Sequence, residues 1–214
     1  MVSEADYADT FALLGRPLGT EDAVSSAEIS EAEAALECRL PGALAAFYQV
    51  AGRALDFTDH HDHFFPPSEW LLHDSKLVFL AENQGVVLYA VDIEVEADDP
   101  PVLMANNDDT LEWEEVCPRC SEFLQVMIHW EGAFGGAMPL IGSATVDERF
   151  REVLAKSFRP RGEVDALWAY SNPGLAVCFV EWADGWKIFV GAANEEALAP
   201  IATLGVELEM TSRR

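Results

Sequence analysis

The chain has 214 residues, half of them hydrophobic, and its 38 acidic and 13 basic residues give a formal net charge of −25. This composition predicts a folded protein rather than a disordered acidic tail. So large a negative charge disfavours direct binding to nucleic acid or to anionic membranes. No apolar stretch reaches the roughly 20 residues that span a bilayer, and the first residues do not resemble a signal peptide. We therefore expect a cytoplasmic protein with no membrane partner.

The negative charge is unevenly distributed along the chain. Residues 1–135 hold 27 acids and 5 bases, whereas residues 136–214 hold 11 acids and 8 bases. This asymmetry predicts two modules with different surfaces. An acidic first module would attract a basic protein and speed the encounter with it. The same acidity also fits a general role in solubility.

The first predicted elements are an N-terminal arm over residues 1–19 and two short helices. The apolar stripe of residues 29–52 is interrupted between Leu40 and Pro41, which separates the two helices. Pro41 suits the first turn of the second helix, and Gly52 stands where a C-terminal cap is expected. Either of two pairs can form a capping box for the first helix: Ser25 with Glu28, or Ser30 with Glu33.

Strands are expected after a loop over residues 53–68. Two apolar runs, 77–80 and 86–91, flank a turn that contains Gly85, and this pattern is typical of a β-hairpin. Residues 92–99 alternate apolar and acidic side chains, which predicts a strand that gives way to a turn. The remaining predictions for this region are a strand over 102–104 and a helix over 121–130.

Residues 136–214 are predicted to form a C-terminal α+β module or extension. Its expected elements are a helix over 147–158, three strands over 166–170, 175–182 and 186–190, a helix capped by Asn194, and an edge strand over 206–210. Turns at 172–174 and 183–185 are expected to join the three strands.

Residues 20–135 resemble the SUKH superfamily. The resemblance is carried by the helical pair with its Leu40-Pro41 step, the run 79–86, the segment 99–102 followed by Trp113, and the helix start at 121–124. It implies an α+β fold in which a helical pair packs on a mainly antiparallel sheet. The implied domains are an arm (1–19), a SUKH-like domain (20–135) and a C-terminal extension (136–214).

Many SUKH proteins are immunity proteins that neutralise bacterial polymorphic toxins. The resemblance therefore implies a non-catalytic protein-binding module whose partner is a basic toxin domain, for example a nuclease. Other members, including fungal regulators of cell-wall synthesis, resemble scaffolds. A housekeeping interaction protein is thus the alternative interpretation.

No motif predicts catalysis, a metal or a cofactor. Cys117 and Cys120 form a Cys-x-x-Cys pair before a helix, but the βαβ context of thioredoxin-type chemistry is absent, and two cysteines supply half of a structural zinc site. The run 60–63 holds three histidines, yet adjacent loop side chains seldom converge on one ion. We expect a non-enzyme, with a redox or zinc role of the cysteine pair as the third interpretation.

The candidate partner-binding residues lie in an acidic segment that contains a tryptophan. Residues 92–115 hold ten acids and no base, and interfaces often place an aromatic anchor within a charged rim. The opposite interpretation is that the tryptophan belongs to the core and the acids form a solvated face. The candidates are Asp98, Asp99, Asp108, Asp109, Glu112, Trp113, Glu114 and Glu115, with Glu69 and Trp70 as a second, weaker set.

Overall fold

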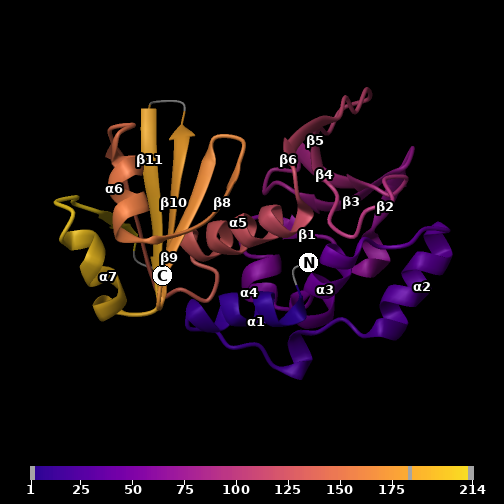
Figure 1. Ribbon diagram of the computed structural model, residues 1–214, viewed down its shortest axis with the longest axis horizontal. Helices are drawn as coiled ribbons and strands as arrows, with labels where there is room; N and C mark the ends of the chain where they lie inside the picture. Colours follow the sequence, from indigo (N-terminus) through magenta and orange to yellow (C-terminus); the bar gives the residue numbers. More distant parts are fainter. Residues whose placement is uncertain (1–2, 183–184, 212–214) are drawn as a thin grey trace. The chain divides into compact units, whose positions relative to one another are not determined.

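The computed structural model describes residues 3–182 and 185–211. These residues form seven α-helices and two six-stranded antiparallel sheets, which confirms the predicted α+β fold (Figure 1). The chain divides into two compact units: the first comprises the residues up to Ala8 with Leu18–Leu124, and the second comprises Asp9–Pro17 with the residues from Gln125 onward. The division falls within helix α5 (Cys120–Ala133), whereas the boundary predicted from the sequence lies after residue 135.

The first unit contains a sheet with the strand order β1-β3-β4-β5-β6, in which β2 also pairs with β3. Helices α2, α3 and α4 lie on one side of these strands (Figure 1). The strands are β1 (His63–Phe64), β2 (Leu71–His73), β3 (Lys76–Ala81), β4 (Val87–Asp92), β5 (Val102–Asn106) and β6 (Glu114–Cys117). The helices are α1 (Glu4–Leu13), which continues into the second unit, η1 (Thr20–Asp22), α2 (Ser26–Leu36), α3 (Gly42–Ala51), α4 (Leu55–Thr58) and η2 (Pro67–Glu69).

The predicted helical pair is confirmed, and its caps are now assigned. Ser25 is the N-cap of α2: the N–H of Glu28 donates to the Ser25 hydroxyl (3.3 Å), and the Ser25 N–H donates to the Glu28 carboxylate (3.2 Å). The first of the two possible capping boxes is therefore the one that forms. Pro41 precedes α3 as its N-cap, and Gly52 ends it. The apolar stripe of α3 is buried, and its Phe47 ring lies 5.3 Å from that of Phe64 on β1.

The hairpin of β3 and β4 is confirmed by its antiparallel register, but the predicted start of a strand after Asp92 is wrong. The Asp92 carboxylate accepts the N–H of Glu94 (3.0 Å), and the Asp92 carbonyl accepts the N–H of Val95 (3.3 Å). These local bonds turn the backbone away from the sheet. The expected loop over 53–68 also contains helix α4, strand β1 and part of the turn η2.

The second unit contains a sheet with the order β12-β7-β11-β10-β9-β8. The three predicted strands appear as β9, β10 and β11, and the N–H of Ala197 donates to the Asn194 side chain (2.9 Å) as the predicted cap requires. Two residues of the turn expected at 183–185 lie outside the described residues. The elements are β7 (Leu140–Val146), α6 (Phe150–Ser157), β8 (Arg159–Val164), β9 (Leu167–Asn172), β10 (Leu175–Trp182), β11 (Gly185–Ala192), α7 (Glu195–Ala202) and β12 (Glu209–Thr211).

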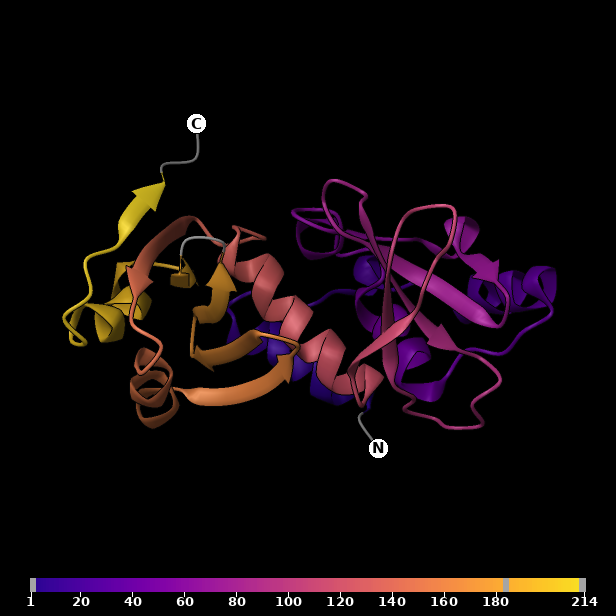
Figure 2. The same ribbon diagram turned by 90° about the horizontal axis from the view of Figure 1, so that it is seen from above.

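The second sheet is covered on both faces. Leu154 of α6 and Ile201 of α7 pack into an apolar cluster on one face, and the C-terminal half of α5 covers the other (Figures 1 and 2). A Cβ atom at Gly191 would stand 1.9 Å from the carbonyl oxygen of Gly132 on α5. Only glycine therefore allows the helix to approach β11 this closely. Across the described residues, no helix is long and apolar enough to cross a membrane.

Candidate partner-binding surface

Trp113 lies at the end of a tight turn between β5 and β6. The Asp108 carboxylate accepts the N–H of Thr110 (2.9 Å), its hydroxyl (2.6 Å) and the N–H of Leu111 (3.3 Å). These hydrogen bonds lower the pKa of Asp108. Leu111 has a φ of 43°, in the left-handed region that side chains rarely adopt. The Asp108 turn holds this backbone and so fixes the approach to Trp113.

Leu111 and Trp113 rest on an apolar face of the first sheet. Val78 pairs with Ala90, and Ala81 pairs with Leu88, so these four residues share one face. They form a buried cluster against which Phe65, Leu111 and Trp113 pack. We call this face, with its three covering side chains, the Trp113 face.

Trp113 belongs only partly to the core. Its side chain is half-buried against the cluster, so part of the ring belongs to the core. Its indole Nε1 is buried and has no hydrogen-bond partner in the described part of the chain. A buried donor without a partner is rare in folded proteins and costs about 1–3 kcal/mol.

Four carboxylates surround Trp113 in sequence and face solvent. Asp109 and Glu112 precede β6, and Glu114 and Glu115 lie on β6, which is the terminal strand of its sheet. Among residues 3–182 and 185–211, none of the four side chains forms a hydrogen bond or an ion pair. We call these four residues the carboxylate rim. Their charge is uncompensated, so it is available to an external cation.

Asp98 and Asp99 lie at the other end of β5, away from the carboxylate rim. Asp99 accepts hydrogen bonds from the backbone N–H (2.7 Å) and the hydroxyl (2.6 Å) of Ser121, in the first turn of α5. A carboxylate at a helix N-terminus stabilises that helix. Asp98 is exposed, and its backbone carbonyl accepts the N–H of Ala43 (2.8 Å). The structure thus divides the predicted acidic set into two groups.

Trp70 is part of the core. Its side chain is 4% exposed, its Nε1 donates to the carbonyl of Phe65 (3.0 Å), and its ring meets that of Tyr48 edge-on at 4.9 Å. The short turn η2 directs the tryptophan inward and leaves Glu69 exposed. Trp70 therefore offers almost no surface to a partner, and we leave it out of the candidate surface.

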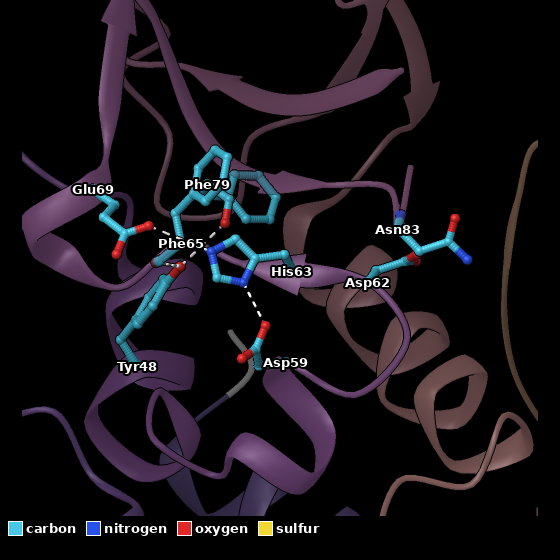
Figure 3. A network of polar contacts seen from close by, with 8 residues as sticks. All are labelled: Tyr48, Asp59, Asp62, His63, Phe65, Glu69, Phe79 and Asn83. Carbon is cyan, nitrogen blue, oxygen red and sulfur yellow. Dashed lines mark hydrogen bonds and ion pairs between the residues drawn. The ribbon is translucent and has the colours of Figure 1, made fainter. Parts of the chain in front are cut away.

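Glu69 belongs to a polar cluster with Asp59 and His63 that was not predicted from the sequence. The two ring nitrogens of His63 face two carboxylates: Nδ1 lies 2.6 Å from Asp59, and Nε2 lies 3.4 Å from Glu69 (Figure 3). Partial burial lowers the pKa of His63, but the hydrogen bonds and charges of Asp59 and Glu69 outweigh it, so the pKa is raised. The only feature of the sequence that could have predicted this cluster is the spacing of Asp59 and His63, which are four residues apart.

The polar cluster joins the segment before β3 to the Trp113 face. The His63 ring meets the Phe65 ring at 5.2 Å, and the Phe65 carbonyl accepts the hydroxyl of Tyr48 (2.7 Å; Figure 3). Phe65 is one of the three side chains that cover the Trp113 face. The buried carboxylate of Asp62 accepts the backbone N–H of Asn83 (3.1 Å) and so anchors the same segment.

The environment of the cysteine pair disfavours the reactive thiolate form. Cys117 and Cys120 are buried free thiols. Burial raises the pKa of Cys117 to about 11 and that of Cys120 well above its ordinary value, whereas reactive cysteines have a lowered pKa. In the described ranges, no group of three or more histidine, cysteine or acidic side chains is placed to hold a metal ion.

Comparisons with protein-family models, with curated proteins and with solved structures found no match to this chain.

Proposed function

We propose that this protein is a non-catalytic binding module that neutralises a bacterial polymorphic toxin by binding a basic toxin domain. The SUKH resemblance of residues 20–135 motivates the proposal. The observation that carries it is the carboxylate rim, four exposed acids without side-chain partners among the described residues that flank the half-buried Trp113 in sequence. The high pKa of the two buried thiols argues against thiolate chemistry as an alternative.

The speed and the strength of binding would depend on different parts of this surface. Uncompensated carboxylates attract a basic partner and raise the association rate. Slow dissociation depends on a few well-packed anchors, and Trp113, Leu111 and Phe65 supply an apolar centre of this kind. A nuclease is a suitable toxin because its substrate cleft must be basic to hold nucleic acid. An acidic surface seated in that cleft would exclude the substrate.

The proposal is tested by affinity capture from the native organism at low and high salt, followed by co-expression of the captured domain. We expect a stoichiometric toxin-like domain, retained better at low salt, whose toxicity to cells is suppressed by this protein. A constitutive cellular partner would contradict the toxin proposal and favour the housekeeping interpretation. No partner in cells that express a candidate toxin would also contradict it.

A charge-removal variant tests the surface itself. Replacing the rim by Asp109→Asn, Glu112→Gln, Glu114→Gln and Glu115→Gln should weaken binding to the captured domain at least tenfold. The matched control removes four exposed acids of the second unit by Glu148→Gln, Glu152→Gln, Glu207→Gln and Glu209→Gln. Since both variants lose four charges, equal effects would show general attraction and would contradict the proposed surface.

A further inference from the structure

The first unit contains a groove away from the Trp113 face. It has a volume of about 770 Å³ and lies between α2, α3 and residues 93–98. The sides of the groove come from one face of each helix. Ser26 and Ser30 line it from α2, and Gly42 and Ala45 line it from α3. Because these residues are small, the two helices leave the space between them unfilled.

Several polar groups that line the groove form no hydrogen bond or ion pair with other described residues. The hydroxyls of Ser26 and Ser30, the Gln49 amide and the carboxylates of Glu96 and Asp98 have no hydrogen-bond or ion-pair partner within the described residues. These groups can hydrogen-bond to a ligand without breaking a bond in the fold. Glu33 also lines the groove, but its carboxylate already accepts the N–H of Leu40 (2.9 Å).

The charge of the groove selects the ligand. Glu33, Glu96 and Asp98 contribute three acids, and Arg39 is the one basic residue in the lining. This balance disfavours phosphates and other anions, and it repels a second copy of a chain with a net charge of −25. Apolar contact is also available from Val95, which lines the groove and is 42% exposed, whereas the apolar lining residues Ile29 and Leu40 are buried. The volume is in the range of organic ligands and well above that of a metal ion.

We propose that this groove binds a lysine- or arginine-bearing segment of a protein partner, with the cationic side chain between Glu33, Glu96 and Asp98. The inference rests on the proposed function only in that the partner is a protein. It adds a second contact surface, because the lining residues are separate from the carboxylate rim and from the Trp113 face.

Two neighbouring glutamates provide a matched test. Glu94 and Glu96 are both exposed and two residues apart, but only Glu96 lines the groove. The probe is a fluorescein-labelled nine-residue peptide of alternating lysine and leucine, with binding followed by fluorescence anisotropy. We expect Glu96→Lys to weaken binding about fivefold and Glu94→Lys to weaken it less than twofold. Equal losses, no loss, or no measurable binding of the peptide to the wild type would overturn the proposal.

A second pair of variants fills the groove without changing its charge. Ser30→Tyr places a large side chain in the groove, whereas Ala27→Tyr places it on an exposed part of α2 that does not line the groove. We expect Ser30→Tyr alone to abolish the amide chemical-shift changes that the peptide causes in α2, α3 and residues 93–98. Shift changes that persist in Ser30→Tyr, or that lie elsewhere in the wild type, would place the peptide outside the groove.

The captured toxin domain separates this inference from the proposed function. If the rim variant weakens toxin binding and Glu96→Lys does not, the proposed function stands and the groove is excluded as a contact. If the peptide binds in the groove but no toxin is captured, the groove inference stands and the toxin proposal fails.

Discussion

At the scale of single residues, the two tryptophans of the candidate sets have different environments. Trp70 is buried and donates a hydrogen bond from Nε1 to the Phe65 carbonyl, whereas the Nε1 of Trp113 has no partner in the described chain. The sequence could not show which indole is anchored, because both tryptophans directly follow a glutamate, Glu69 or Glu112, and lie next to strands. Only the tertiary packing decides which indole is anchored.

This difference predicts opposite effects of the same substitution. Trp70→Phe removes a buried hydrogen bond and leaves the Phe65 carbonyl with one donor fewer, so it should lower the free energy of unfolding by at least about 1 kcal/mol. Trp113→Phe loses no hydrogen bond and should lower it by less, while weakening partner binding. Urea denaturation of the two variants measures the difference. A larger loss for Trp113→Phe would contradict the assigned environments.

His129 makes the second unit sensitive to acid. The residue is fully buried on α5, with Nδ1 2.7 Å from the Gln125 carbonyl, and burial lowers its pKa to about 4 from an ordinary 6.5. Protonation therefore favours the unfolded state: the free energy of unfolding is unaffected above pH 6.5 and falls as the pH drops toward 4. The loss at pH 4 is on the order of 3 kcal/mol.

His129→Leu should remove that part of the pH dependence. The variant is expected to lose stability more slowly than the wild type between pH 6.5 and 4, as measured by urea denaturation at several pH values. His73→Gln, at an exposed histidine, serves as the control. Parallel pH profiles for the wild type and His129→Leu would show that His129 does not titrate as described.

At the scale of elements, local signals predicted the helices and the main hairpins well. The Ser25 cap, the Gly52 end of α3 and the β3–β4 hairpin all depend on residues close in sequence. Strand β7 was missed because its partners β11 and β12 are distant in the sequence, and β8 was missed because its sequence is atypical, although it pairs with the next strand, β9. Strand β7 contains Gly142, and β8 is an edge strand with Pro160 and Gly162. Such strands are defined by their neighbours in the sheet.

The candidate surface was predicted only in part, because some of its contacts join residues that are distant in the sequence. The acidic run was visible in the sequence, but Asp99 pairs with Ser121, 22 residues away, and so caps a helix. The groove between α2 and α3 was not predicted, since it depends on how residues 93–98 lie against two helices. Neither the Asp99–Ser121 contact nor the packing of residues 93–98 against the helices produces a recognisable pattern in the local sequence.

The capping box gives a prediction at the scale of one helix. Ser25→Ala should lower the free energy of unfolding by about 1 kcal/mol, because the N–H of Glu28 loses its acceptor. Ser30→Ala lies within α2, where alanine is the better helix former, and should be neutral or slightly stabilising. Thermal or urea denaturation compares the two. The reverse order would assign the cap to Ser30.

At the scale of the whole molecule, charge differs between the two parts of the chain. The carboxylate rim and the acidic groove both lie in the first unit, while residues 136–214 hold nearly balanced charges. Each unit has an antiparallel sheet and a core of its own. We therefore assign partner recognition to the first unit, and we expect its electrostatic attraction to be the main determinant of the association rate.

The most direct test of this assignment is the association rate of the captured toxin domain as a function of salt. The rate for the wild type should fall steeply as the ionic strength rises, because exposed charges are screened. The rim variant should start lower and show a flatter dependence, and the four-acid control in the second unit should follow the wild type. Identical salt dependence for the rim variant and the wild type would contradict the claim that the carboxylate rim of the first unit recognises the partner.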